Sequence, residues 1–256
     1  MPTCASGASR ALGLLRFKLR SLKECRYSTF TKLYTSCVVP ILDYGAAVWG
    51  YKFQAGAEVV QHRAIKYFLG VHRFAANSMI EGDMGWLSCT SRRKLAMLNF
   101  WNRLVKCPVN RLLYKVFMWD ISFVDQNNSW AFEIFDIMET LGYTSAFASK
   151  STIDMQSAFN KSLILEQSKW NIARFEMPKL RYYNLYKSYF ETEEYVYINI
   201  SKRLRSVLAQ FRAGILPLEV ELGRYSGKPL KERLCSFCTL QKVEDEYHFF
   251  VHLRVL

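Results

Sequence analysis

Two cysteines and two histidines near the end of the printed sequence have the types and the spacing of a metal site. Cys235 and Cys238 are separated by two residues, and His248 follows after nine more. His252 is four positions beyond His248, so the two rings are expected to project from the same side of a helix. A Cys-x2-Cys arm followed by two histidines is a ligand set that binds Zn²⁺. The spacing predicts one zinc site; a weak three-ligand site that lacks His252, and no metal, are the two alternatives.

No other group of residues in the sequence has the spacing of an active site. Phosphoryl transfer by two metal ions needs paired aspartates, and no Asp-Asp pair occurs. Glu244, Asp245 and Glu246 are consecutive, and neighbours on a helix do not face a single site, so they predict an acidic first helical turn. The Walker loop, GxSxG and HExxH are absent as well. The chain is therefore predicted not to be an enzyme and to have no small-molecule substrate.

The formal charge of the chain is +13, and it is unevenly distributed. Residues 1–72 carry ten basic and three acidic side chains, and residues 73–119 carry eight and two. Residues 120–170 are acidic, with three basic and seven acidic side chains, and residues 171–256 are basic again. Such a distribution favours a polyanionic partner, above all nucleic acid. A basic domain without such a partner is the alternative.

Cysteine use and hydropathy indicate the compartment. The seven cysteines are an odd number, and five of them are scattered without disulfide or ligand spacing. The longest apolar run, 37–50, contains Asp43 and is shorter than the roughly 20 residues that a membrane helix needs. We therefore expect an intracellular, soluble protein of the nucleus or the cytoplasm, with no membrane partner.

Helical periodicity dominates the sequence and predicts a mainly α fold. A helix of about 57–69 is expected to end at Gly70, because glycine adopts the left-handed conformation that closes helices. Ser88 or Ser91 is expected to start another helix, and Ser201 to cap a late one. The remaining expected helices include 110–119, 129–141 and 154–175.

Two weaker patterns concern strands and aromatic residues. Residues 216–222 alternate in hydropathy as a strand does, and residues 235–243 can form a small hairpin. Six aromatic residues in the first third of the chain recur on apolar helical faces, which favours a core position over base stacking. They are Tyr34, Tyr44, Trp49, Tyr67, Phe68 and Trp86.

Several blocks of sequence occur in an order that resembles a known family. These blocks are LYTSCVVPILDYGAAVWG (33–50), QHRAIKYFLGVH (61–72), EGDMGW (81–86), KLRYYNLYK (179–187), RSVLAQFRAGILPLEVELGRY (205–225) and RLCSFC…VEDEYHFF (233–250). Their order resembles the region that follows the polymerase palm in reverse transcriptases of LINE-type (non-LTR) retrotransposons. The Tyr-x-Asp-Asp box of that family's active site is absent here. The chain therefore looks like the later part of a polymerase without its catalytic centre.

The resemblance implies a division of the mainly α chain. The implied parts are a basic helical thumb-like region at 1–120, a linker at 121–152, a helical C-terminal region at 153–225 and an incomplete zinc-knuckle-like tail at 226–256. In the family's knuckle the fourth ligand is a cysteine, and this sequence has Leu253 at that position. His252 either replaces that ligand or only precedes it.

The resemblance also implies a function, that of a non-catalytic nucleic-acid-binding remnant of a reverse transcriptase. Such a remnant contacts template–primer or RNA through the phosphate backbone. Carried over by position, the basic residues of the thumb-like region are Arg16, Arg20, Lys23, Lys32, Arg63 and Lys66. Lys179, Arg181 and Lys187 are interleaved with tyrosines, which suits contact with a single strand.

The partners expected on this basis are RNA, DNA or a hybrid duplex, and an intact reverse transcriptase acting in trans. The alternative function is that of a helical protein-interaction or structural domain, or of a decayed transposon fragment with no activity.

Overall fold

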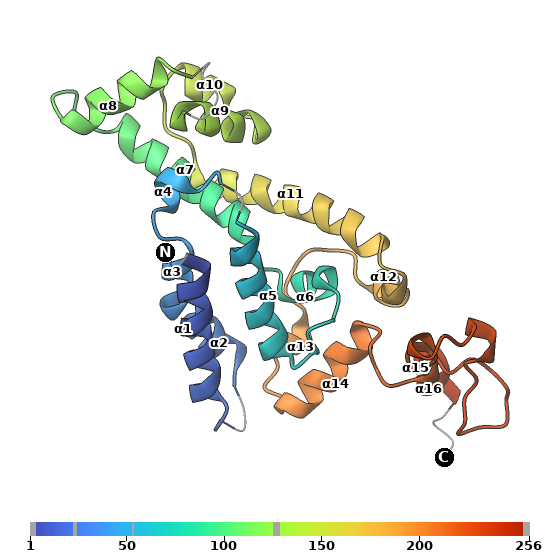
Figure 1. Ribbon diagram of the computed structural model, residues 1–256. Coiled ribbons are helices and arrows are strands. Elements are labelled where there is room, and N and C mark those ends of the chain that lie inside the picture. Colours follow the sequence, from blue (N-terminus) through green and yellow to red (C-terminus); the bar gives the residue numbers. More distant parts are fainter. Residues whose placement is uncertain (1–3, 23–24, 53, 125–128, 253–256) are drawn as a thin grey trace. The chain divides into compact units, whose positions relative to one another are not determined.

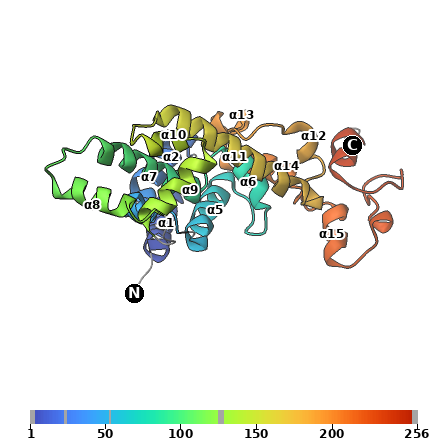
Figure 2. The same ribbon diagram turned by 90° about the horizontal axis from the view of Figure 1, so that it is seen from above.

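The structure is a computed structural model that describes residues 4–22, 25–52, 54–124 and 129–252 (Figures 1 and 2). Over these residues the chain is built of helices and forms no strand, which confirms the mainly α fold class. None of the helices in the described ranges is long and apolar enough to cross a lipid bilayer.

The first half of the chain contains α1 (Cys4–Leu19), α2 (Tyr27–Cys37), α3 (Val39–Leu42), α4 (Ala46–Trp49), α5 (Ala55–Leu69), α6 (Asn77–Met84), α7 (Cys89–Val105) and α8 (Leu112–Ile121). The second half contains α9 (Trp130–Thr140), α10 (Thr144–Ala148), α11 (Met155–Phe175), η1 (Pro178–Leu180), α12 (Tyr183–Tyr186), α13 (Glu194–Tyr197), α14 (Lys202–Arg212), α15 (Glu219–Tyr225), η2 (Leu230–Glu232) and α16 (Glu246–His252). Helices α5, α8, α9 and α11 correspond to the four ranges expected from the sequence.

Serine caps and a left-handed glycine set the ends of several helices. Ser88 caps α7 by accepting a hydrogen bond from the amide of Ser91 at 3.1 Å, so Ser88 is the cap of the two candidates. Ser201 caps α14 by accepting from the amide of Leu204 at 3.3 Å, as expected. A cap of this kind stabilises a helix by about 1 kcal/mol. Gly70 follows the end of α5 with a φ of 72°, which confirms its expected role.

The chain forms two compact units, and each is assembled from separate stretches of sequence. The first unit comprises residues 1–17, 31–61 and 87–168, and the second comprises residues 18–30, 62–86 and 169–256. Helices α1, α2, α5 and α11 contribute residues to both units. The division predicted from the sequence is into continuous ranges, and it stays a prediction.

The core of the first unit lies between α7, α8, α9 and α10, which are grouped together in Figures 1 and 2. Trp101 of α7 stacks on Phe147 with 5.2 Å between ring centroids and meets the edge of Phe117 at 5.3 Å. Its indole N–H donates to the carbonyl of Ser151 at 3.0 Å. The largest ring of this core is therefore buried with its polar group satisfied.

The first unit also contains a polar cluster around Asp43, at the end of α3. Arg92 donates to the Asp43 carboxylate at 2.5 Å, and Arg93 donates to it at 3.3 Å. Arg92 further donates to the side-chain oxygen of Gln61 at 2.8 Å. Asp43 is thus a structural acceptor that ties α7 to the short helices α3 and α4.

The second unit is built around α6. Asp83 is fully buried there, and Arg212 of α14 donates to both of its carboxylate oxygens at 2.7 Å. The hydroxyl of Tyr195 donates to the same carboxylate at 2.7 Å, and burial raises the pKa of this tyrosine well above its usual value. Trp170 of α11 donates to the carbonyl of Ser78 at 2.6 Å. These bonds connect α6 to the segments before and after α12.

The two strand expectations have different outcomes. Residues 216–222 do not form a strand, because Glu219–Tyr225 is helix α15, in which Val220 is buried and Leu222 is exposed. A short alternation cannot be distinguished from one side of a short helix. The 235–243 segment does fold back on itself, through a single antiparallel bridge between Leu234 and Val243.

Candidate metal centre and candidate nucleic-acid interface

The first candidate site is formed by the turn between η2 and α16, together with the first turns of α16. The bridge at Leu234 and Val243 brings the ends of this turn together, and the amide of Cys235 donates to the carbonyl of Lys242 at 2.9 Å. Gln241 adopts a φ of 50°, which reverses the chain direction at the tip. The fold-back places the Cys-x2-Cys arm against α16.

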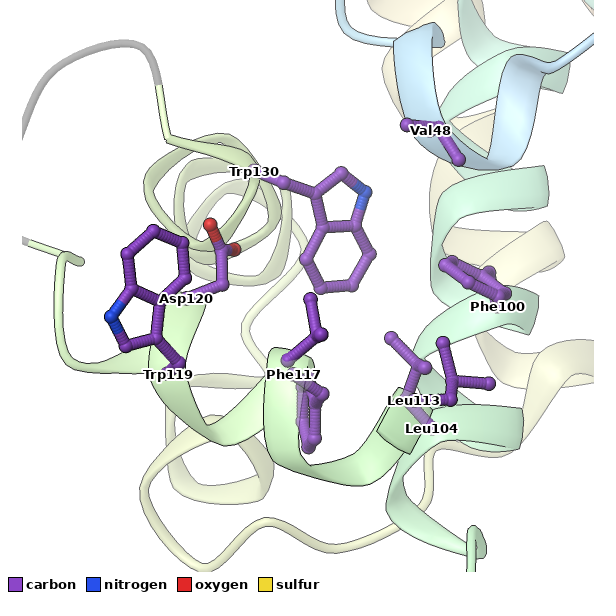
Figure 3. A pocket seen from close by; sticks show the side chains of 9 residues that line it. Val48, Phe100, Leu104, Leu113, Phe117, Trp119, Asp120 and Trp130 are labelled. Carbon is purple, nitrogen blue, oxygen red and sulfur yellow. The ribbon is translucent and has the colours of Figure 1, made fainter. Parts of the chain in front are cut away.

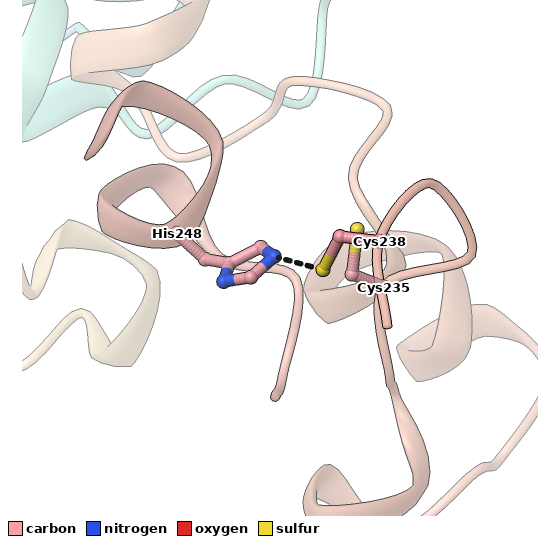
Figure 4. Close-up of side chains that lie close together, drawn as sticks. All are labelled: Cys235, Cys238 and His248. Atoms are coloured by element: carbon pink, nitrogen blue, oxygen red, sulfur yellow. Dashed lines mark hydrogen bonds between the residues drawn. The ribbon is translucent and has the colours of Figure 1, made fainter. Parts of the chain in front are cut away.

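Cys235, Cys238 and His248 come together as the sequence predicts (Figure 4). Their sulfur and nitrogen atoms all lie within 4.8 Å of one another, and the Cys238 Sγ is 3.2 Å from the His248 Nε2. A tetrahedral Zn²⁺ bound by sulfur and imidazole places its ligand atoms about 3.5–3.8 Å apart. The three donors therefore fit such an ion after sub-ångström shifts, and the cluster can hold a metal.

Burial and hydrogen bonding prepare this cluster for a cation. Cys235 and His248 are both buried, and burial raises the pKa of the Cys235 thiol. A buried thiol ionises readily only when a positive charge compensates the thiolate, which is what a bound Zn²⁺ does. The amide of Phe237 donates to the Cys235 sulfur at 3.4 Å, as amides commonly do to metal-bound thiolates.

The acidic residues before His248 have a structural role. Asp245 accepts a hydrogen bond from the amide of His248 at 2.8 Å, which caps the start of α16. Its other carboxylate oxygen accepts from the hydroxyl of Tyr182 at 2.6 Å. Glu246 is buried and is bound by Arg181 at 2.5 Å. The expected acidic first turn is therefore present, and it holds the histidine in place through bonds to the 181–182 segment.

The fourth predicted ligand lies outside the described part of the chain. The side chain of His252 and all of Leu253 belong to that undescribed end. The structure thus assembles three of the four residues predicted to bind zinc, and the identity of the fourth ligand stays a prediction.

The second candidate site is the loop after α5, where two of the predicted nucleic-acid-binding lysines meet. Lys66 of α5 donates its ammonium to the carbonyl of Arg73 at 2.9 Å. Lys179 of η1 donates its ammonium to the carbonyl of Phe74 at 2.9 Å. Residues from two blocks that are distant in the sequence therefore hold neighbouring carbonyls of one loop. Arg73 itself adds a third cation, with its guanidinium 4.6 Å from the centre of the Phe74 ring.

The position of this loop is determined by the end of α5 and by α14. Gly70 reverses the chain in the left-handed conformation, and the amide of Val71 donates to the carbonyl of Lys66 at 3.1 Å. Ser206 of α14 donates its hydroxyl to the carbonyl of Gly70 at 2.6 Å. A Cβ at position 70 would lie 2.8 Å from that of Ser206, so only glycine fits.

The pKa values of the two lysines are lowered, mainly by burial. Burial lowers the pKa of Lys66, and the positive charge of Lys179 lowers it further. Burial likewise lowers the pKa of Lys179. The negative charges of Glu81 and Glu221 act in the opposite direction on Lys66 and Lys179 respectively, but each of these carboxylates also pairs with another side chain, Glu81 with His62 at 2.5 Å and Glu221 with Arg224 at 2.6 Å. An anion at this loop would relieve the repulsion between the ammonium groups.

The other predicted basic residues lie in several places. Arg63 is exposed on α5 one turn before Lys66, and Arg181 is exposed near its partner Glu246. Arg16 and Lys32 are exposed in the first unit, and Arg20 is exposed in the second. Lys23 lies outside the described residues.

Lys187 differs from the other predicted basic residues because it is almost fully buried. Its ammonium is 2.5 Å from the Glu193 carboxylate and donates to the carbonyl of Glu191 at 2.8 Å. It stabilises the second unit from within and presents no charge on the surface. The sequence gives no sign of this, since nothing in the residues around Lys187 distinguishes it from Lys179 in the same run.

A third feature, an apolar cavity of the first unit, was not expected from the sequence. It has a volume of about 180 Å³ and lies among α4, α7, α8 and α9 (Figure 3). Trp130 faces Phe100 across it, and Asp120 lies at its edge. The polar groups of Trp130 and Asp120 form hydrogen bonds within the protein. Trp130 donates to the carbonyl of Ala47 at 3.0 Å, and Asp120 accepts from the amide of Ala131 at 2.8 Å.

Comparison with known proteins finds no matching family model, no matching curated protein and no matching solved structure. A functional proposal for this chain therefore depends on its own residues and on the order of its sequence blocks.

Proposed function

We propose that this chain is a non-catalytic nucleic-acid-binding part of a LINE-type reverse transcriptase, which contacts the phosphate backbone of template–primer or RNA. The observation that carries the proposal is the meeting of Lys66, Arg73 and Lys179 at one loop. Lys66 comes from QHRAIKYFLGVH, the block in which the resemblance to that family is closest, and Lys179 comes from KLRYYNLYK, another of the resembling blocks.

The chemistry of the loop suits phosphate oxygens. An ammonium has three N–H donors, so the bond from Lys66 or Lys179 to a loop carbonyl does not exhaust either group. Arg73 adds a planar guanidinium, which can bind a phosphate through two parallel hydrogen bonds. Because these contacts would be made only to the phosphate backbone of the nucleic acid, they would position it without reading its sequence.

The tail contributes a structural site within the same proposal. Cys235, Cys238 and His248 would hold Zn²⁺, with His252 as the fourth ligand. Several large apolar side chains of this small region, such as Phe237 and Leu240, are exposed, so the bound ion would supply stability that a core does not, since a structural zinc contributes folding energy directly. Through Asp245 and Glu246 the ion would also stabilise the 181–182 segment, which begins two residues after Lys179 in the sequence.

Salt-dependent binding tests the proposal. The purified chain, mixed with fluorescently labelled duplexes and single strands of unrelated sequence, should bind all of them and lose at least tenfold in affinity between about 50 and about 200 mM salt. Lys66→Gln with Lys179→Gln should weaken binding about equally for every sequence. The control is Lys150→Gln with Lys169→Gln, which removes the same charge from two exposed lysines elsewhere. Undetectable binding at low salt, or equal losses in the two double variants, would refute the proposal.

The alternative, a helical protein-interaction or structural domain, is favoured by the surface of α8. Several large apolar side chains of that helix are exposed, namely Leu112, Leu113, Val116 and Trp119. Contiguous apolar surface of this kind marks contact with other molecules. The salt titration separates the two functions, because an apolar interface changes little with salt whereas phosphate contacts weaken steeply.

A further inference from the structure

The loop after α5 presents an aromatic ring to solvent. The Phe74 side chain is 63% exposed, although the residues on both sides of the turn, Val71 and Ala75, are buried. A single exposed phenylalanine is common on protein surfaces and needs no explanation by itself. The surroundings of this ring are what distinguish it.

The two peptide groups that flank Phe74 are held by hydrogen bonds. Lys66 binds the carbonyl of Arg73 and Lys179 binds the carbonyl of Phe74, each at 2.9 Å. The amide of Ala75 donates to the carbonyl of His72 at 2.9 Å, which closes the turn. A ring held in this way loses little conformational freedom when a ligand covers it.

One cationic group lies over the ring, and two more are bound to the main chain of the same turn. The guanidinium of Arg73 lies 4.6 Å from the ring centre, and the ammonium groups of Lys66 and Lys179 are bound to the carbonyls of the same turn. The imidazole of His72 is 5.0 Å away and tilted by 54°, so it does not stack on the ring. The site thus offers an exposed flat apolar ring on a turn that also carries three cationic groups. A ligand that matches both is flat, and it carries negative charge at its edge.

We propose that Phe74 is a stacking platform for an unpaired nucleobase of a single strand, and that Lys66, Arg73 and Lys179 bind the phosphates on either side of that base. This inference rests on the proposed nucleic-acid binding and deepens it. Each base of a duplex is stacked between its neighbours and cannot cover a protein ring, whereas an unpaired base can. Single-stranded RNA and DNA both supply this chemistry. Arg73 can remain on one face of the ring while the base covers the other.

The test replaces the ring at a matched pair of positions. Phe74→Leu keeps an apolar side chain and removes the flat face. Phe175→Leu is the control, because Phe175 is 64% exposed and the guanidinium of Arg174 lies 4.5 Å from its ring centre. The probe is an unstructured, labelled oligonucleotide of about 12 nucleotides, as RNA and as DNA of the same sequence, beside a duplex of equal length. Fluorescence anisotropy at low salt gives the affinities.

Phe74→Leu should weaken binding of the single strand by about tenfold, within the fivefold to hundredfold range of one lost base stack, and should leave duplex binding within about twofold. Phe175→Leu should change neither affinity by more than about twofold, and Phe74→Trp should restore single-strand binding. The RNA and DNA arms show which strand the loop prefers.

Three outcomes contradict the inference, and they can be told apart. If the unmodified chain binds no nucleic acid, both the proposed function and the inference fail. If the lysine variants weaken binding but Phe74→Leu does not, backbone binding stands and the stacking platform fails. If Phe74→Leu and Phe175→Leu weaken binding equally, the ring acts only as exposed apolar surface.

Discussion

The buried pair of Asp83 and Arg212 is the interaction whose loss should affect the fold most. The carboxylate of Asp83 is fully buried, and the side chain of Arg212 is only 13% exposed. Arg212→Met removes two charge-assisted hydrogen bonds and leaves the carboxylate with tyrosine hydroxyls, those of Tyr195 and Tyr183, as its side-chain donors. Removing one partner of a buried ion pair costs about 3–5 kcal/mol, because the remaining charge is uncompensated.

Substitution of the acidic partner, Asp83, should lower the free energy of unfolding less than substitution of Arg212. In Asp83→Asn the guanidinium of Arg212 keeps a second carboxylate, that of Glu193, at 3.2 Å. We therefore expect a loss of about 1–3 kcal/mol for Asp83→Asn, the usual cost of a buried hydrogen bond left unmade. The double variant should lose less than the two single variants together, by at least about 1 kcal/mol, because neutralising Asp83 removes the charge that Arg212→Met leaves behind.

Chemical and thermal unfolding followed by circular dichroism measures these differences. Arg212→Met should lower the unfolding temperature by about 6–20 °C, given about 2–4 °C for each kcal/mol in a chain of this size. Arg203→Met is the control, since Arg203 is exposed on the same helix and its loss should change stability by less than about 0.5 kcal/mol. Equal stabilities of Arg212→Met and Arg203→Met would refute the reasoning from burial.

Three further predictions follow from the two candidate sites. About one equivalent of zinc should co-purify with the chain and be lost in His248→Ala, as metal analysis would show; Leu253→Cys should raise the zinc content greatly only if His252 is not a ligand. Since burial lowers the pKa of Lys66 and Lys179, nucleic-acid affinity should fall with rising pH before exposed lysines lose their protons at about pH 10.4. Arginine at both positions should abolish that fall. The chain should incorporate no nucleotide on a primed template with Mg²⁺ or Mn²⁺, and extension that is lost on mutation within this chain would contradict the prediction that it is not an enzyme.

Features that depend on neighbouring residues in the sequence could be predicted. Ser201 caps the start of the helix that follows it, and Gly70 adopts the left-handed conformation after the helix that precedes it. The structure places a helix end at each. The grouping of Cys235 and Cys238 with His248 was also predictable, because the ligand spacing and the helix carrying His248 are both local signals. The range 216–222 was predicted wrongly, since a short alternation fits either a strand or one side of helix α15.

Features that depend on contacts between distant segments could not be predicted. Lys179 and Lys187 belong to the same basic and aromatic run, yet one borders an exposed loop and the other is buried against Glu193. Nothing within that run distinguishes the two lysines. Aromatic residues show the same limit: Tyr34 and Phe68 are buried as expected, whereas Tyr44 and Trp49 of the same segment are exposed. Whether these rings are buried depends on helices that come later in the chain.

The interleaved construction of the two units has a consequence for how the protein is synthesised. Residues 18–30 and 62–86 belong to a unit whose third stretch begins only at residue 169. The apolar side chains of Phe30 and Phe68, buried in the finished protein, therefore leave the ribosome long before their complete surroundings exist. During that interval they are exposed to other nascent chains and to chaperones. No single cleavage of the chain separates one unit from the other, and a stop in translation before residue 168 leaves both units incomplete.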